Sequence, residues 1–119
     1  MNVNKVISEL KTLYPTGNIV LNTPENTTEI ICELDPVYQK KAVAVIDYSA
    51  RHFHREITET YVVTKGHLVV YLFDRQVDLK VGDSLTIKPN TVHYAKGNET
   101  WFMVYSTPGW KKEDHILLP

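Results

Sequence analysis

A chain of 119 residues can bury a hydrophobic core of its own and needs no disulfide or structural metal to fold. The apolar share of 43% and the charged share of 23% are those of an ordinary globular protein. A net charge of −1, with lysine and arginine scattered along the chain, argues against a nucleic-acid partner.

The N-terminal segment predicts one short amphipathic helix within residues 1–16. Apolar residues recur there at helical spacing: Val3, Val6, Ile7, Leu10, Leu13 and Tyr14. Pro15 and Gly17 then end the pattern. The segment has no continuous apolar run, so we expect neither a signal peptide nor a membrane span, and we expect a cytoplasmic protein without a membrane partner.

The sequence after this helix predicts short strands only. The segments are 28–34, 42–48, 60–64, 68–73, 77–81, 85–88, 92–95 and 101–107. Cys32 alternates with Ile30 and Leu34, which predicts a buried, inert thiol, and a lone cysteine cannot form an internal disulfide. Gly, Pro, Asn or Asp at each break favours an all-β sandwich or barrel. We therefore expect a single domain over residues 1–119, with a barrel over about 28–107 and a tail, 108–119, folded back over the surface.

Two histidines one residue apart are the first candidate ligands for a metal. In an extended segment His52 and His54 project from the same face, roughly 7 Å apart along the strand. Glu59 follows a short polar turn and opens the next strand, so two imidazoles and a carboxylate can converge. His93, at the start of a distant β-prone run, is the candidate fourth ligand. First-row transition metals prefer this mixture of nitrogen and oxygen donors, and four protein ligands leave positions open for water or substrate.

At these positions the chain resembles the cupin superfamily. Two of its motifs match: His52-x-His54-x4-Glu59-x6-Gly66 and Gly82-x6-Pro89-x3-His93. The resemblance implies a small single-domain cupin with a double-stranded β-helix, or jelly-roll barrel. It also implies that His52, His54, Glu59 and His93 bind a divalent Fe, Mn, Ni or Zn ion. Small cupins commonly pair through their sheets, so a homodimer is expected as well.

Three positions depart from the family pattern without removing a ligand. Ile46 stands where the first motif usually begins with glycine, and Gly97 stands where an asparagine often follows the last histidine. Asn90 replaces a glycine after the motif proline. Asparagine tolerates the left-handed backbone conformation better than most residues, so we expect that turn to persist.

Other polar and aromatic residues have competing interpretations. Tyr61 shares the face of Glu59 and is the candidate catalytic residue, whereas other aromatic or sulfur-containing side chains are expected in the barrel core: Tyr48, Trp101, Met103 and Tyr105. His67 is expected on the surface. His115 is also expected there, with closure over the barrel mouth as the alternative. Arg51 and Arg55 either bind an anionic substrate or face water. Trp110 is a candidate oligomer contact.

The ligand set is compatible with two kinds of enzyme on a small polar organic substrate. A Lewis-acidic metal suits an isomerase or epimerase acting on sugars or hydroxy-carbonyl compounds, and Fe(II) suits a dioxygenase. Neither motif contains a second carboxylate to serve as a free base, which makes proton transfer harder to assign. The alternative is a non-catalytic sugar- or metabolite-binding cupin.

Overall fold

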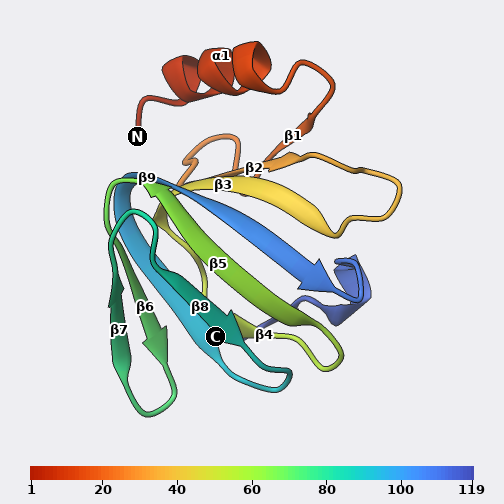
Figure 1. Ribbon diagram of the computed structural model, residues 1–119, viewed down its shortest axis with the longest axis vertical. Helices are drawn as coiled ribbons and strands as arrows, with labels where there is room; N and C mark the ends of the chain where they lie inside the picture. The colour runs from red at the N-terminus through yellow and green to blue at the C-terminus, as the bar shows by residue number, and fades with distance from the viewer.

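The computed structural model describes residues 1–119 as a curled antiparallel sheet with one α-helix on its outer face (Figure 1). The elements in chain order are α1 (Val3–Leu13), β1 (Asn18–Leu21), β2 (Glu29–Glu33), β3 (Lys41–Tyr48), β4 (His52–Phe53), β5 (Thr58–Lys65), β6 (Leu68–Leu72), β7 (Gln76–Leu79), β8 (Ser84–Ile87), β9 (His93–Thr107), the short 3₁₀ helix η1 (Lys112–Asp114) and β10 (Ile116–Leu117). The predicted all-β jelly-roll barrel with one N-terminal helix is confirmed.

The helix α1 forms where the apolar spacing predicts it. The side chain of Asn2 accepts a hydrogen bond from the Lys5 backbone N–H and caps the first turn. Val6 and Leu10 are fully buried and face the sheet. They pack on the outer side chains of the neighbouring strands: Ile30, Cys32, Val43, Val45 and Trp101. Cys32 is buried, as predicted, and burial raises the pKa of its thiol.

The continuous apolar run of β3 is explained by burial on both faces of the strand. Val43 and Val45 contact the layer under α1, whereas Ala44 and Ile46 face the barrel interior. β2 pairs with β3 in register, so its alternate residues divide in the same way. A strand covered on both sides needs apolar residues at every position, which is why simple alternation is absent.

The prediction of two strands over 92–95 and 101–107 is wrong, because both belong to the fifteen-residue strand β9. Glu99 adopts a left-handed φ of 47°, and the register against β3 shifts between Ile46 and Tyr48. The turn-forming residues therefore make a bulge that bends β9 without ending it. This bend allows one strand to pair with β3, β4, β5 and β6.

The C-terminal tail returns to the barrel and adds a strand to the sheet. The Trp110 N–H donates to the Gln39 carbonyl at 2.7 Å, and β10 pairs with β4. The Leu118 N–H then donates to the Arg51 carbonyl. No helix in the structure has the length and apolar character needed to cross a membrane.

Candidate metal centre

The structure brings the four candidate ligands to one point inside the barrel. One donor atom from each of His52, His54, Glu59 and His93 lies within 4.8 Å of all the others, and all four residues are buried. The cluster is therefore a candidate metal centre whose members come from segments far apart in the chain.

Strand pairing explains how these side chains meet. His52 lies in β4 directly opposite His93, the first residue of β9. His54 follows β4, and a bend at Arg55 reverses the chain toward Glu59 in β5. The predicted turn between the histidine pair and the glutamate therefore exists.

Each imidazole is held by a hydrogen bond at the ring nitrogen that faces away from the centre. Nδ1 of His52, His54 and His93 lies 2.8, 2.7 and 2.8 Å from the carbonyl oxygens of Ala50, Asp114 and Thr91, respectively. A carbonyl only accepts, so each Nδ1 carries the proton. Each Nε2 is then left with a lone pair directed inward, which is the tautomer a metal ligand needs.

The nitrogen and oxygen atoms that face the centre lie close together. Oε1 of Glu59 lies 3.1 Å from Nε2 of His54 and 3.4 Å from Nε2 of His93. The His93 nitrogen is buried and has no hydrogen bond. Lone pairs crowded in this way are stabilised by a proton or by a cation between them. Three imidazole nitrogens and one carboxylate fit a divalent first-row metal ion.

The charges of the cluster shift its pKa values in opposite directions. Burial, followed by the neighbouring His93, lowers the pKa of His52 to about 3. Burial opposes a charge on His54, but the hydrogen bond to Glu59 and its negative charge outweigh burial and raise the His54 pKa. Burial likewise opposes ionisation of Glu59, yet the hydrogen bond to His54 and the proximity of His93 hold its pKa below the ordinary value. Glu59 is therefore ionised at neutral pH.

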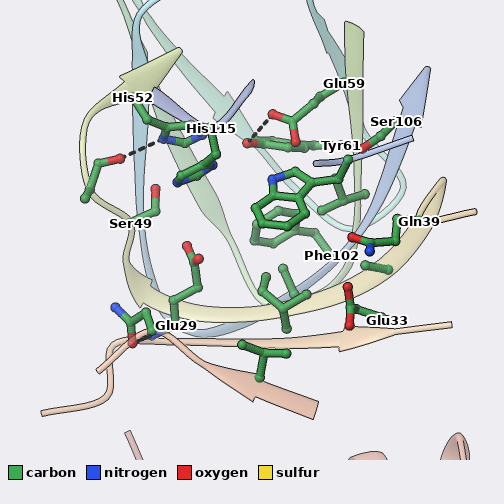
Figure 2. A pocket seen from close by; sticks show the side chains of 18 of the residues that line it. Glu29, Glu33, Gln39, Ser49, His52, Glu59, Tyr61, Phe102, Ser106 and His115 are labelled. Atoms are coloured by element: carbon green, nitrogen blue, oxygen red, sulfur yellow. Dashed lines mark hydrogen bonds between the residues drawn. The ribbon is translucent and has the colours of Figure 1, made fainter. Parts of the chain in front are cut away.

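A cavity of about 490 Å³ opens beside this cluster (Figure 2). His52 and Glu59 line it, whereas His54 and His93 do not. The cluster thus has one side toward the cavity and one side closed by protein. Tyr61 also lines the cavity, and its hydroxyl lies 3.4 Å from Oε1 of Glu59, which places the candidate catalytic tyrosine beside the cluster.

Glu29 is a cavity residue that sequence reasoning missed. It begins β2, and its carboxylate points into the cavity from the strand facing the histidine–glutamate cluster (Figure 2). Burial, followed by the negative charge of Glu59, raises the pKa of Glu29 to about 7. The only sequence signal was its alternation with the buried Ile30 and Cys32, which places Glu29 on the opposite face of the strand.

The prediction that His115 lies on the surface is wrong. Its ring stacks on His52 with centroids 4.4 Å apart, it lines the cavity, and its Nδ1 is buried without a hydrogen-bond partner. Trp110, expected as an oligomer contact, also lines the cavity, 5.8 Å from the His115 ring. Pairing of β10 with β4 draws this part of the tail against the cluster.

The remaining candidates lie away from the cavity. His67 is exposed, as predicted, and Arg51 and Arg55 are exposed and do not line the cavity. The expectation of a core position is wrong for Tyr48 and Tyr105, which are each 41% exposed.

Trp101 is buried and Met103 is half-buried, as expected of core residues. Both belong to the layer under α1, outside the barrel interior. Asn90 adopts a left-handed φ of 65°, so the turn survives the loss of the family glycine, as predicted.

Comparison with known proteins places the chain in a family. A family model described as "Cupin domain" matches residues 43–105, more than half of the chain. Among curated proteins, none matches the sequence significantly.

Solved structures share the fold at low sequence identity. The nucleoside dehydratase Pac13 is 18% identical, with a TM-score of 0.73 and 88% of each chain covered. Streptomyces Pac13 with uridine gives a TM-score of 0.76 at 17% identity, covering 89% of this chain and 88% of that one. KdgF from Halomonas sp. is 18% identical, with a TM-score of 0.56 and 82% of each chain covered.

Bacillus subtilis oxalate decarboxylase is 15% identical, with a TM-score of 0.70 over 88% of this chain but only 31% of that one. This chain therefore corresponds to about one third of the oxalate decarboxylase. The barrel, its ligand cluster and the matched family model together show that the chain belongs to the cupin domain family.

Proposed function

We propose that the protein is a divalent-metal-dependent enzyme that transfers protons on a small polar organic molecule, as an isomerase, epimerase or dehydratase does. The observation that carries the proposal is the inward orientation of three Nε2 atoms around Glu59, each fixed by a hydrogen bond behind the ring. Such an arrangement holds Fe, Mn, Ni or Zn through His52, His54, Glu59 and His93.

A metal ion bound there supplies Lewis acidity to a carbonyl or hydroxyl oxygen of the substrate. The protein's own contribution is a cavity that reaches the ligands from one side only, past His52 and Glu59. Burial, followed by the charges of Glu59 and Glu29, raises the pKa of Tyr61 well above its ordinary value. Tyr61 therefore keeps its proton at neutral pH and serves as a hydrogen-bond donor.

Proton transfer is favoured over oxygen chemistry because the cavity contains a carboxylate that is not a candidate ligand. Glu29 supplies the acid–base group that the two motifs lack. The dehydratase Pac13, which resembles this chain in fold, is a relative with a related kind of chemistry. A dioxygenase needs no such group.

The test begins with protein purified without a nickel column. We expect about one metal ion per chain, either as isolated or after reconstitution with Mn²⁺, Fe²⁺ or Zn²⁺. Incubation of the metal-loaded protein with small hydroxy-carbonyl compounds should convert them to product or exchange their C–H hydrogens with solvent, without consuming oxygen. Failure to bind any metal contradicts the proposal, oxygen uptake assigns a dioxygenase instead, and ligand binding without turnover assigns a metabolite-binding protein.

A further inference from the structure

We propose that Glu29 is the acid–base residue of this cavity and that the substrate is an uncharged, polyhydroxylated carbonyl compound. The proposal rests on the proposed function, because the metal site gives the substrate its orientation. Neither cupin motif contains Glu29, which lies in β2, outside the matched residues 43–105.

The position of Glu29 follows from the two faces of β2. Ile30 and Cys32 are fully buried beneath α1, so the alternate residues Glu29, Ile31 and Glu33 point to the other face. That face forms one wall of the cavity, and all three residues line it. In Figure 2 the Glu29 carboxylate extends from this wall toward Ser49 and His115, with Glu59 and Tyr61 at the opposite wall.

The carboxylate of Glu29 has no structural partner. Its backbone N–H donates to Asn22 and its carbonyl accepts from Asn22, but the side chain makes neither a hydrogen bond nor an ion pair. Glu33, two residues along the same face, is bonded through one oxygen to Asn18 and through the other to the Gln39 amide nitrogen at 3.1 Å. A half-buried carboxylate in a cavity wall without a partner costs stability, so the structure gives Glu29 no stabilising role.

The surroundings of Glu29 suit a group that gains and loses a proton near neutral pH. The titratable side chains around the cavity are Glu33, Lys41, His52, Glu59, Tyr61 and His115. Burial and the charge of Glu59 raise the pKa of Glu29 to about 7, which is near the optimum for a residue that acts as both base and acid.

The charges of the cavity select against an anionic substrate. Away from the candidate metal centre, its wall carries the carboxylates of Glu29 and Glu33, and its one ammonium group belongs to Lys41. Arginine, the usual ligand of carboxylate and phosphate groups, is absent from the lining.

The uncharged part of the lining suits hydroxyl groups and carbon rings. Hydroxyl and amide side chains come from Asn22, Thr23, Gln39, Ser49 and Ser106. Phe102 and Trp110 add an apolar surface. A neutral sugar-like molecule uses both kinds of contact without bringing a further negative charge near Glu29 and Glu33.

The reaction step uses both protonation states of Glu29. The carboxylate removes a proton from the carbon next to the substrate carbonyl, the C–H electron pair forms a C=C bond, and the carbonyl π pair moves to its oxygen. When the carbonyl re-forms, the carboxylic acid returns a proton to the carbon, which gives isotope exchange if the acid has first traded its proton with solvent. Epimerisation follows where the enolate turns its other face to the acid before the proton is returned. If a β-hydroxyl leaves instead, it takes that proton and departs as water.

The test follows exchange of substrate C–H groups in D₂O by proton NMR, with the metal-loaded protein. The probes are the neutral sugars D-ribose, D-xylose and D-fructose, with pyruvate as the anionic control. The wild type should exchange the C–H next to the carbonyl of at least one sugar faster than pyruvate. Glu29→Gln should slow this exchange by about 100-fold or more, because general acid–base catalysis contributes about that factor.

Glu25→Gln is the control, since it removes the same charge at an exposed turn that does not line the cavity, and it should retain the exchange rate. A second readout, independent of turnover, is the carboxyl ¹³C shift of Glu29, which should titrate near pH 7. Metal content separates the two proposals: a wild type without metal refutes the proposed function. Metal-loaded Glu29→Gln with the wild-type exchange rate refutes the role of Glu29. Exchange of pyruvate alone, or of no probe, by the loaded wild type refutes the substrate class.

Discussion

The carbonyl oxygen of Asp114 accepts the Nδ1 hydrogen of His54 at 2.7 Å, across 60 residues of sequence. The same residue also fixes the turn that follows His54. Its carboxylate accepts the backbone N–H groups of Arg55 at 2.8 Å and of Glu56 and Ile57 at 3.1 Å each. One tail residue therefore holds a candidate ligand and the segment that leads to the next one, Glu59.

Replacement of Asp114 should weaken metal binding. Asp114→Ala leaves three N–H groups without acceptors and releases the tail segment that orients His54. Loss of a group that orients a ligand typically lowers metal affinity by about 10- to 100-fold. Competition with a chromophoric chelator measures this change, and circular dichroism checks that the variant folds. Glu113→Ala, at the exposed neighbouring position, is the control, and equal affinities for the two variants would count against this role of Asp114.

Removal of one imidazole should abolish tight metal binding. His54→Ala deletes a buried donor within the cluster, and the three remaining ligands cannot enclose the ion as well. His67→Ala removes an exposed histidine at a hairpin and should leave metal content unchanged. Elemental analysis measures the metal content of both variants. Unchanged metal content in His54→Ala would remove His54 from the ligand set.

Metal affinity should fall as the pH is lowered, and His54 should be the first group to compete. Only the neutral imidazole binds a metal. The raised pKa of His54 means that a proton competes with the metal at that ring before it competes at His52, whose pKa is lowered to about 3. We expect affinity to decline toward pH 6 and the metal to be lost below about pH 6. Isothermal titration across this range measures the decline, and tight binding well into the acid range would contradict a site built mainly from histidines.

Glu29→Gln should stabilise the metal-free protein at neutral and alkaline pH. The wild-type pKa of this carboxyl is raised from 4.5 to about 7, so the folded state holds the proton more tightly than the unfolded chain. The contribution of Glu29 to stability is therefore present below pH 4.5 and is lost as the pH rises through 7. Glutamine does not titrate, so the advantage of the variant should grow across this window, by up to about 3 kcal/mol.

Urea unfolding of the two metal-free proteins at several pH values measures this difference. Glu25→Gln serves again as the control for loss of one negative charge, because this residue is exposed. A difference that stays constant with pH, or that grows equally in both variants, would show that Glu29 is not an unpartnered carboxylate. A residue that lowers stability without a partner is typical of an active site, where function opposes stability.

The sequence predicted that the four candidate ligands lie together because their geometry is largely local. His52, His54 and Glu59 lie within one strand–turn–strand segment, and only His93 had to be added from a distant strand. The sequence did not indicate that Glu29 and His115 line the cavity. Their positions depend on pairing of β2 with β3 and of β10 with β4, and no local pattern encodes those pairings. The bulge in β9 was missed for a related reason, since turn-forming residues serve equally in a turn and in a bend. The homodimer and the cytoplasmic location stay predictions.

The helix α1 should contribute to stability without contributing to the metal centre. Leu10 is fully buried between α1 and the outer faces of β2 and β3, on the side of the sheet opposite the cavity. Leu10→Ala should therefore lower the free energy of unfolding by about 2–5 kcal/mol, as buried leucine truncations do. Leu13→Ala, at a position that is 61% exposed on the same helix, should change it far less.

Metal content shows whether Leu10 contributes to stability alone or also to the metal centre. Under native conditions, folded Leu10→Ala should bind as much metal as the wild type, because the backbone of β2 and β3 stays paired while the outer layer loses only packing. Thermal unfolding and elemental analysis of the same samples test both statements. Loss of metal at a temperature where the variant is still folded would mean that the outer layer positions the cavity wall, and that the two faces of β2 are coupled.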